Sequence, residues 1–345
     1  MEPITTAIIG FGYMGEWHYN NIIKSHCLDI RYAFDIDDER RKVATSYGLY
    51  VSDNINELLL NNNIRAFIIA TPNDTHEYYI KLAIDYEKNI ICEKPVTLSS
   101  ESLAELIKLA DSKKLRFTAH FNRRWDYDYQ DLVSVVQSEI VGNINYIESR
   151  VCSSYGTMYG WRADSKIGGG LLYDWGPHLI DQALNIIKGH QVTRIDYTVK
   201  SIRTSTVDDY FRLKLSFSNG INYYIECGIL SLIAVPRWRV YGVDGTVSGD
   251  SRLKVALFNN SHYMPIKLSK NDSSRLMSNS GMNITSFYWD RTSYNDHSDF
   301  YRNFQFAING GTSLFVSSID MMRVSSIIDA IKSQNMESGS ISTLI

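Results

Sequence analysis

The sequence predicts an N-terminal α/β domain with a parallel sheet, followed by an α+β domain with a large, predominantly antiparallel sheet. Short apolar runs alternate with segments of helical length through the first third of the chain. After about residue 122 the strand-like stretches become longer and alternate in polarity. A chain of 345 residues is also long enough to bury two cores. We therefore expect one domain over residues 1–122 and another over residues 123–345.

The first domain shows strand and helix signals in regular succession. A helix is predicted after Ser99, which can cap it, because Leu103, Leu106, Ile107 and Ala110 recur at helical spacing. Runs typical of strands cover residues 6–9, 30–34, 66–70, 90–92 and 117–121. This alternation favours βαβ units and hence a parallel sheet.

The second domain shows the alternation typical of antiparallel strands. Turn signals at residues 218–220 (Ser-Asn-Gly) and 243–245 (Val-Asp-Gly) join strand-like flanks. The predicted strands cover residues 145–152, 210–217, 221–227 and 237–242. Residues 259–286 are polar and predict loops, whereas residues 299–308 and 320–331 have helical periodicity.

Composition excludes several classes of partner. The 35 basic and 38 acidic residues give a formal charge of -3, and the absence of a long Lys/Arg run argues against nucleic acid. The sequence contains neither a signal-type segment nor an apolar stretch of membrane-spanning length, so we expect a cytoplasmic protein without membrane contact. Four scattered cysteines (Cys27, Cys92, Cys152 and Cys227) suggest neither a disulfide framework nor a metal site.

A glycine motif follows the first predicted strand and precedes a segment of helical length. Gly10, Gly12 and Gly15 give the G-x-G-x-x-G pattern of dinucleotide-binding loops. Gly10 permits a tight turn, Gly12 lets the backbone approach a pyrophosphate, and Gly15 allows close packing of the helix. The alternative is an ordinary strand-to-helix turn. The residues predicted to line the cofactor here are Gly10, Phe11, Gly12, Tyr13, Met14 and Gly15.

Asp35 ends the second predicted strand, where a carboxylate can accept hydrogen bonds from an adenosine ribose diol. A carboxylate repels a 2′-phosphate, so we expect NAD rather than NADP. Arg40 and Arg41 follow closely and can in principle receive that phosphate, which leaves NADP as the alternative.

Residues 71–76 (Thr-Pro-Asn-Asp-Thr-His) follow a third apolar run and belong to the same edge of the predicted sheet. A cofactor lying along this edge would cross Thr71, Pro72 and Asn73. A turn in which Asp74 or Thr75 caps the next helix is an alternative, and it is compatible with cofactor contact.

Lys94 follows the apolar run at residues 90–92 within Glu93-Lys94-Pro95. A lysine amine that is partly desolvated near the positive nicotinamide ring is expected to have a lowered pKa, which suits proton exchange with a substrate hydroxyl. A surface lysine before a helix that Pro95 begins is the alternative. A cis bond before Pro95 would redirect Lys94 into the cleft.

The segment from Gly168 to Asp181 carries the second group of candidate catalytic residues. Pro177 suits the first turn of a helix, which places His178 at the positive N-terminal end. His178 is therefore expected to be neutral near pH 7 and able to accept a proton. Asp174 and Asp181 are each placed to orient the imidazole or bind a substrate hydroxyl. A histidine that only packs in the core is the alternative.

Together these motifs resemble the Gfo/Idh/MocA oxidoreductase family. The resemblance rests on the glycine motif, Thr71-Pro72-Asn73 with His76, Glu93-Lys94-Pro95, Trp161-Arg162 and the segment from Gly168 to Asp181. It implies a Rossmann domain followed by a sheet domain that commonly forms homodimers or homotetramers. It also implies a catalytic set of Lys94, Asp174 and His178. The cofactor contacts it implies are Thr71, Asn73, His76, Glu93, Lys94, Asn122, Trp161 and Arg162.

The resemblance implies a dehydrogenase that transfers hydride between NAD and a hydroxyl carbon of a cyclic polyol or sugar. Either His178 or Lys94 removes the hydroxyl proton, and Arg123, Asp174 and Asp181 bind the substrate. Residues 121–126 and 169–174 are similar to scyllo-inositol dehydrogenase-like members, many of which prefer NADP; Asp35 departs from that preference. An NAD-dependent glycosidase and a non-catalytic sugar sensor are the alternatives.

Overall fold

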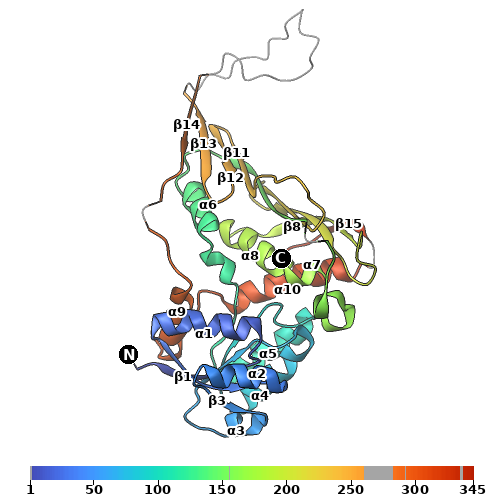
Figure 1. Ribbon diagram of the computed structural model, residues 1–345. Coiled ribbons are helices and arrows are strands. Elements are labelled where there is room, and N and C mark those ends of the chain that lie inside the picture. The colour runs from blue at the N-terminus through green and yellow to red at the C-terminus, as the bar shows by residue number, and fades with distance from the viewer. Residues whose placement is uncertain (1, 155, 260–282, 292, 335–336) are drawn as a thin grey trace, which may run out of the picture.

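The computed structural model describes residues 2–154, 156–259, 283–291, 293–334 and 337–345. Two sheets organise these residues: a parallel sheet near the N-terminus and a larger sheet that follows it (Figure 1). This architecture confirms the predicted fold class.

The first sheet is a parallel Rossmann-type sheet with the strand order β3-β2-β1-β4-β5-β6. Its strands are β1 (Ile4–Ile9), β2 (Leu28–Phe34), β3 (Tyr50–Ser52), β4 (Ala66–Ile69), β5 (Asn89–Cys92) and β6 (Phe117–Ala119). Ile8, Ile68 and Ile91 are fully buried in the central strands, because helices cover both faces of such a sheet. The short edge strand β3 was not predicted, since three residues give no detectable alternation.

Helices cross between these strands: α1 (Tyr13–Ser25), α2 (Asp38–Ser46), α3 (Ile55–Leu59), α4 (His76–Asp85) and α5 (Ser100–Ser112). A 3-10 turn, η1 (Asn73–Thr75), precedes α4. The predicted start of α5 is confirmed, because the Ser99 hydroxyl accepts a hydrogen bond from the Ser102 amide at 3.4 Å. Leu103, Leu106 and Ala110 form its buried face, as their spacing predicted.

The second sheet has the order β14-β13-β12-β11-β7-β10-β9-β8-β15 within the described residues. Its neighbours are antiparallel except β7 and β10, which run parallel. The strands are β7 (Ile144–Cys152), β8 (Val192–Lys200), β9 (Tyr210–Phe217), β10 (Asn222–Gly228), β11 (Trp238–Gly242), β12 (Gly245–Gly249), β13 (Leu253–Phe258), β14 (Ile284–Tyr288) and β15 (Ser338–Ser342). Both predicted turns join adjacent antiparallel strands. The loop predicted over residues 259–286 is wrong at its end, where β14 begins; residues 260–282 lie outside the described residues.

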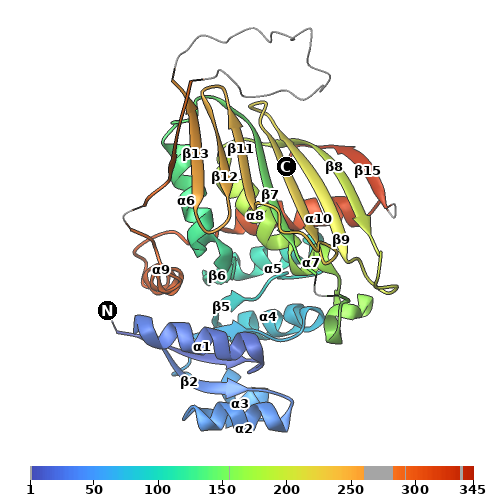
Figure 2. The same cartoon turned by 45° about the horizontal axis from the view of Figure 1, so that its top comes forward.

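Helices line the face of the second sheet that is turned toward the first domain (Figure 2). They are α6 (Tyr127–Gln137), α7 (Leu171–Asp174), α8 (Gly176–Ile186) and α10 (Ser318–Lys332). The predicted helices near the C-terminus are confirmed as α9 (Ser298–Ile308) and α10.

Helix α9 returns to the first domain, where it packs beside α1 (Figure 1). Gln305 donates to the Glu2 carbonyl at 2.9 Å, and Arg116 donates to the Ala307 carbonyl at 2.9 Å. Helix α9 thus belongs by sequence to the predicted second domain, residues 123–345, but packs on the first.

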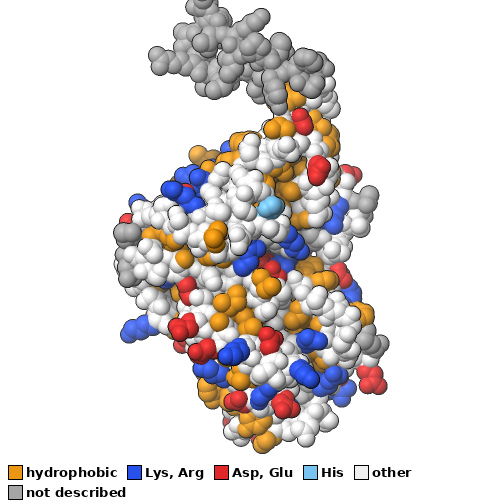
Figure 3. Space-filling view, turned by 180° about the vertical axis from the view of Figure 1, so that it is seen from behind, with side chains coloured by type: hydrophobic (Ala, Val, Ile, Leu, Met, Phe, Trp, Pro, Cys, Tyr) orange, Lys and Arg blue, Asp and Glu red, His pale blue; other side chains and the backbone are white. Residues whose placement is uncertain are grey.

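The surface carries both signs of charge. On the face shown in Figure 3, Lys and Arg side chains are interspersed with Asp and Glu. Within the described part of the chain, no helix has both the length and the apolar character required to cross a membrane.

Candidate active site and cofactor cleft

The glycine loop between β1 and α1 has the geometry that a dinucleotide requires. Gly10 has φ +89°, and a side chain there would approach the Ala70 carbonyl oxygen to 2.8 Å. A side chain on Gly15 would overlap the Gly10 carbonyl. Gly12 is the N-cap of α1 without a side-chain cap, and the space beside its Cα is open. The helix N-terminus is thus available to a phosphate, so these residues fit the predicted cofactor.

Asp35 is held against this loop. Its Oδ2 accepts a hydrogen bond from the Phe11 amide at 2.7 Å, and its Oδ1 accepts one from the Asp37 amide at 2.9 Å. Of Phe11, only the backbone faces this group, because its ring is buried in the core. A carboxylate oxygen can accept two hydrogen bonds, and each Asp35 oxygen accepts one of those just given. Asp35 therefore retains acceptor capacity for a ribose hydroxyl.

Both arginines that follow Asp35 already have partners. Arg41 donates to the carbonyls of Asp35 and Ile36 at 3.0 and 2.9 Å. Arg40 forms an ion pair with Glu16 at 3.6 Å. Arg41 is therefore held by the backbone, whereas Arg40, with 48% of its side chain exposed, makes a surface ion pair.

The loop after β4 is braced from inside the protein. The Asn73 amide donates to the Gly168 carbonyl at 3.0 Å. The His76 ring lies between the carbonyls of Thr71 and Pro95, at 2.8 Å from each, and is fully buried. Burial lowers the pKa of His76. His76, predicted to touch the cofactor, instead links two loops of the cleft.

Lys94 reaches across from the first domain to the second. The Lys94–Pro95 peptide is cis, as the sequence suggested. Lys94 Nζ donates to Asp174 Oδ1 at 2.9 Å and to the Asp174 carbonyl at 2.7 Å. Arg162 Nε donates to Asp174 Oδ2 at 3.0 Å. Burial alone would raise the pKa of Asp174, but Lys94 and Arg162 outweigh it and lower that pKa. Asp174 is therefore ionised, and it ties the three side chains together.

The glycine run places Asp174. Gly168 and Gly170 have φ of +78° and +100°, which strongly favour glycine. A side chain on Gly170 would overlap the Asp208 carboxylate. Asp208 in turn accepts the Leu172 amide at 2.6 Å and so holds the start of α7, which ends at Asp174.

His178 lies in the first turn of α8, after Pro177, as predicted. Its Nδ1 is buried and, among the described residues, has no hydrogen-bond partner. Burial, with smaller contributions from Lys94 and Arg123, holds the pKa of His178 well below its usual range. His178 is therefore neutral near pH 7 and has an unused ring nitrogen.

Polar and aromatic side chains surround this group. The Arg123 guanidinium stacks over the Trp175 ring at 4.2 Å and pairs with Asp126 at 3.1 Å. Arg162 stacks over Trp161 at 4.5 Å. Asn122 Oδ1 is buried without a partner among the described residues. These side chains offer both stacking surfaces and unused polar atoms.

Asp181 lies outside this cluster. Both of its carboxylate oxygens accept hydrogen bonds from Arg124, at 2.8 and 2.5 Å, and the residue is only 1% exposed. Arg124 also donates to the Phe315 carbonyl at 2.7 Å. Asp181 was expected to bind substrate, but the structure places it in a buried ion pair instead.

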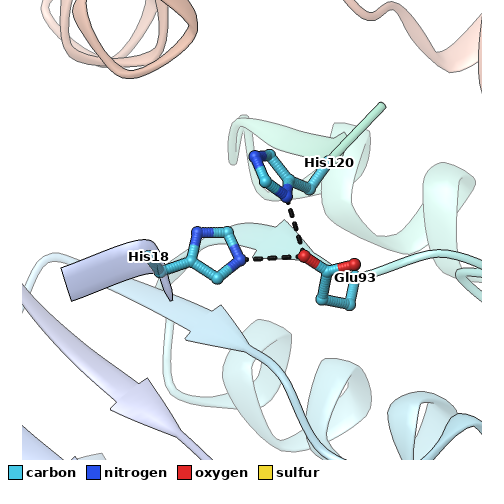
Figure 4. A group of neighbouring side chains, drawn as sticks. All are labelled: His18, Glu93 and His120. Carbon is cyan, nitrogen blue, oxygen red and sulfur yellow. Dashed lines mark hydrogen bonds and ion pairs between the residues drawn. The ribbon is translucent and has the colours of Figure 1, made fainter. Parts of the chain in front are cut away.

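Sequence reasoning missed a cluster of buried polar side chains that His18, Glu93 and His120 form (Figure 4). Glu93 Oε1 lies 3.0 Å from His18 Nε2 and 2.7 Å from His120 Nδ1. Glu93 was expected to touch the cofactor, whereas its carboxylate faces these two buried rings. The available signal was the spacing of Gly15, His18 and Ile22, which places a histidine on the buried face of α1.

These features are typical of an oxidoreductase that uses a nicotinamide dinucleotide. They are the glycine loop with its free helix N-terminus, the group of Lys94, Asp174 and Arg162, and the neutral His178. Residues 4–121 match an oxidoreductase family with an NAD-binding Rossmann fold, and residues 129–248 match the Gfo/Idh/MocA C-terminal domain. The chain belongs to the Gfo/Idh/MocA oxidoreductase family, and its cofactor is NAD(P).

Known relatives agree with this assignment. An uncharacterized oxidoreductase of Schizosaccharomyces pombe is 30% identical over 230 residues, 63% of this chain and 61% of that protein. The scyllo-inositol 2-dehydrogenase (NADP(+)) IolW of Bacillus subtilis is 25% identical over 71% of this chain and 68% of its own. The chain spans about three fifths of the length of the first curated relatives it matches. The crystal structure of an NAD-binding protein from Listeria innocua has a TM-score of 0.90, with 28% identity over 99% of this chain and 100% of that one.

Proposed function

We propose that this protein is an NAD-dependent dehydrogenase that oxidises a secondary hydroxyl of a cyclic polyol or sugar. The observation that carries the proposal is the Lys94 amine that Asp174 fixes at 2.9 Å, together with the neutral His178 at the start of α8, whose pKa burial and Lys94 lower. The name of the scyllo-inositol dehydrogenase relative supports a polyol substrate.

The hydrogen bonds divide the work between the catalytic residues. Lys94 Nζ uses two N–H groups on Asp174, which leaves the third to bind the substrate oxygen. Asp174 fixes the direction of that amine. The neutral His178 ring accepts the hydroxyl proton at a ring nitrogen as the carbinol C–H bond breaks and the carbonyl forms. NAD, when bound, takes up the hydride. The two hydrogen bonds that Lys94 donates to Asp174 support our assignment of His178 as the proton acceptor.

The surroundings of Asp35 support NAD as the cofactor. An anionic carboxylate disfavours a 2′-phosphate, and Arg41 is engaged by the carbonyls of Asp35 and Ile36. The name of IolW gives NADP(+) as its cofactor, so we expect this protein and IolW to differ in cofactor preference.

The test is the absorbance of reduced nicotinamide when the protein is mixed with NAD or NADP and a panel of inositols, aldoses and sugar acids. Reduction of NAD by a polyol supports the proposal. His178→Asn is expected to lower kcat by about 10²- to 10⁴-fold. The matched control is His190→Asn, which replaces a histidine outside the cluster and leaves kcat unchanged.

Two outcomes contradict the proposal. Binding of NAD without turnover of any panel member indicates a sensor. Release of an aglycone from a glycoside without net formation of NADH indicates a glycosidase.

A further inference from the structure

A chain of hydrogen bonds links four buried side chains, of which His18, Glu93 and His120 are drawn in Figure 4. Tyr301 of α9 lies 2.8 Å from His18 Nδ1, and His18 Nε2 lies 3.0 Å from Glu93 Oε1. His120, which follows β6, reaches the same oxygen through Nδ1 at 2.7 Å. All four residues are at most 5% exposed. The chain therefore joins four separate elements at one carboxylate.

The donors and acceptors in this chain follow from the charge of Glu93. Burial alone would raise the pKa of Glu93, but His120 and His18 outweigh it and hold that pKa well below its usual range. An ionised carboxylate only accepts hydrogen bonds, so His18 Nε2 and His120 Nδ1 both donate. The other nitrogen of His18, Nδ1, pairs with the Tyr301 hydroxyl at 2.8 Å.

The same three side chains, His18, Glu93 and His120, are of the types that bind metal ions. Their separations of 3.0 and 2.7 Å are those of direct N–H···O hydrogen bonds. A zinc ion would instead have to lie about 2.0–2.2 Å from each ligand, with both ring nitrogens deprotonated toward it. These distances therefore describe a hydrogen-bonded cluster, and metal analysis of the purified protein tests the alternative.

The chain ends on the backbone of Lys94. Glu93 Oε2 accepts a hydrogen bond from the Lys94 amide at 3.3 Å. The Glu93 amide donates to the Ile69 carbonyl at 2.9 Å, and the His120 amide donates to the Cys92 carbonyl at 2.8 Å. The Glu93 side chain thus fixes the peptide from which Lys94 reaches Asp174, while neighbouring strands fix its backbone.

We propose that His18, His120 and Tyr301 are positioning residues for the reaction: they hold Glu93 so that Lys94 leaves β5 in the direction of Asp174. This inference rests on the proposed dehydrogenase function. Small displacements of a catalytic group reduce turnover strongly, whereas the glycine loop that binds the cofactor phosphates lies on another part of the sheet edge. Loss of the chain is therefore expected to reduce kcat and leave NAD affinity nearly unchanged.

The kinetic test compares removal of each donor with its replacement. His120→Leu removes the donor to Glu93, and we expect kcat to fall by about 10- to 100-fold. His120→Asn keeps an N–H group near the position of Nδ1 and is expected to recover most of the loss. His18→Leu and His18→Gln form the corresponding pair, because the glutamine amide reaches the position of Nε2. Tyr301→Phe removes only a hydroxyl and keeps the packing of α9.

The matched control is Tyr129→Phe, which removes the buried hydroxyl that donates to the Gln182 carbonyl in the second domain. It is expected to leave kcat unchanged. Unfolding curves on all variants identify those that fail to fold, and for such a variant Tyr301→Phe carries the test.

A second measurement does not depend on turnover. Two-bond ¹H–¹⁵N spectra of [¹⁵N]histidine-labelled protein report which ring nitrogen carries the proton, and the variants assign the signals. The expected result is His18 protonated at Nε2 and His120 protonated at Nδ1. The opposite tautomer of either ring overturns the chain.

Three further results overturn the proposal while the wild type is active. These are an unchanged kcat in folded His120→Leu, a His120→Asn variant as slow as His120→Leu, or a bound metal ion that is lost in both leucine variants. If the wild type reduces NAD with none of the panel substrates, the result is different, because it contradicts the proposed function and not the positioning role.

Discussion

Two carboxylates in one segment of the chain, Asp174 and Asp181, have opposite surroundings. Asp174 lies between Lys94 and Arg162, with 15% of its side chain exposed. Asp181 pairs with Arg124, with 2% of its side chain exposed. Lys94 and Arg162 lower the pKa of Asp174 against the effect of burial. Burial prevails over Arg124 at Asp181 and raises its pKa.

The difference between the two regions shows what separates a site from a structural ion pair. Beside Asp174, the Nδ1 of His178 is unused among the described residues, and Lys94 has spare donor capacity. At Asp181 both carboxylate oxygens are engaged by Arg124, which is itself held by the Phe315 carbonyl. A buried carboxylate with a cation partner is therefore not by itself a sign of function. Unused polar atoms next to it are the better sign.

The largest expected effect is at the Asp174 region. Lys94→Ala is expected to lower kcat by about 10²- to 10⁴-fold, because it removes the group that binds the reacting oxygen. NAD affinity is expected to change far less. Steady-state kinetics and a direct binding titration measure the two quantities separately. Turnover at the wild-type rate would refute the role of Lys94.

The Asp181 region is expected to respond in stability instead. Asp181→Asn removes the bidentate charge partner of the buried Arg124 and leaves it the Asp320 carboxylate at 3.4 Å, which is expected to lower the free energy of unfolding by up to about 3–5 kcal/mol. The remaining folded enzyme is expected to keep its kcat. Denaturant unfolding and kinetics on one preparation measure both. Replacing the pair together, as Asp181→Leu with Arg124→Met, is expected to recover most of the stability. A large loss of kcat in Asp181→Asn, with stability retained, would remove the distinction between the regions.

A pH titration of stability examines the histidines around Glu93. Burial lowers the pKa of His120 to about 4. The unfolded chain therefore binds a proton between pH 6.5 and 4 that the folded chain does not, so stability falls as the pH falls through this window. The contribution of His120 is about 3 kcal/mol. Unfolding at several pH values is expected to show a shallower slope for His120→Asn than for the control His190→Asn. Equal slopes would contradict the neutral, buried state of His120.

The smallest expected effect concerns the cofactor. Asp35→Ser removes the carboxylate that disfavours a 2′-phosphate, and the preference for NAD over NADP is expected to fall about tenfold, or about 1.4 kcal/mol. Binding titrations with the two cofactors measure the ratio. The Asp85→Ser variant is the matched control, because Asp85 is an exposed carboxylate at the C-terminal end of α4, away from the glycine loop. An unchanged ratio in Asp35→Ser would show that another group sets the preference.

Local patterns were sufficient to predict much of the fold. Gly10, Gly12 and Gly15 sit between a buried strand and a helix, where each glycine has a distinct physical task. The periodicity after Ser99 gave α5, and the Asn-Gly and Asp-Gly turns gave the hairpins of the second sheet. Local patterns also singled out Lys94, Asp174 and His178 as candidates, because each lies near a recognisable strand end or helix start.

The remaining features depend on contacts between distant parts of the chain. His18 and Tyr301 meet only because α9 returns to pack beside α1. Arg124 forms its ion pair with Asp181 because α8 packs against the turn that carries Arg124. From the sequence, Asp181 is a helical residue near Asp174, and this alone could not show that one carboxylate belongs to the site and the other to a structural ion pair. Burial and pairing, which decide that question, are properties of the folded chain.

The most direct test of the account follows deuterium from a substrate labelled at the carbinol carbon. A polyol that reduces NAD in the panel is used in labelled form, and the reduced cofactor and the product are analysed by mass spectrometry. Deuterium in the reduced nicotinamide, together with a ketone product and loss of this transfer in His178→Asn, is the predicted result. Deuterium retained in the organic product with no labelled NADH would contradict net hydride transfer at this site.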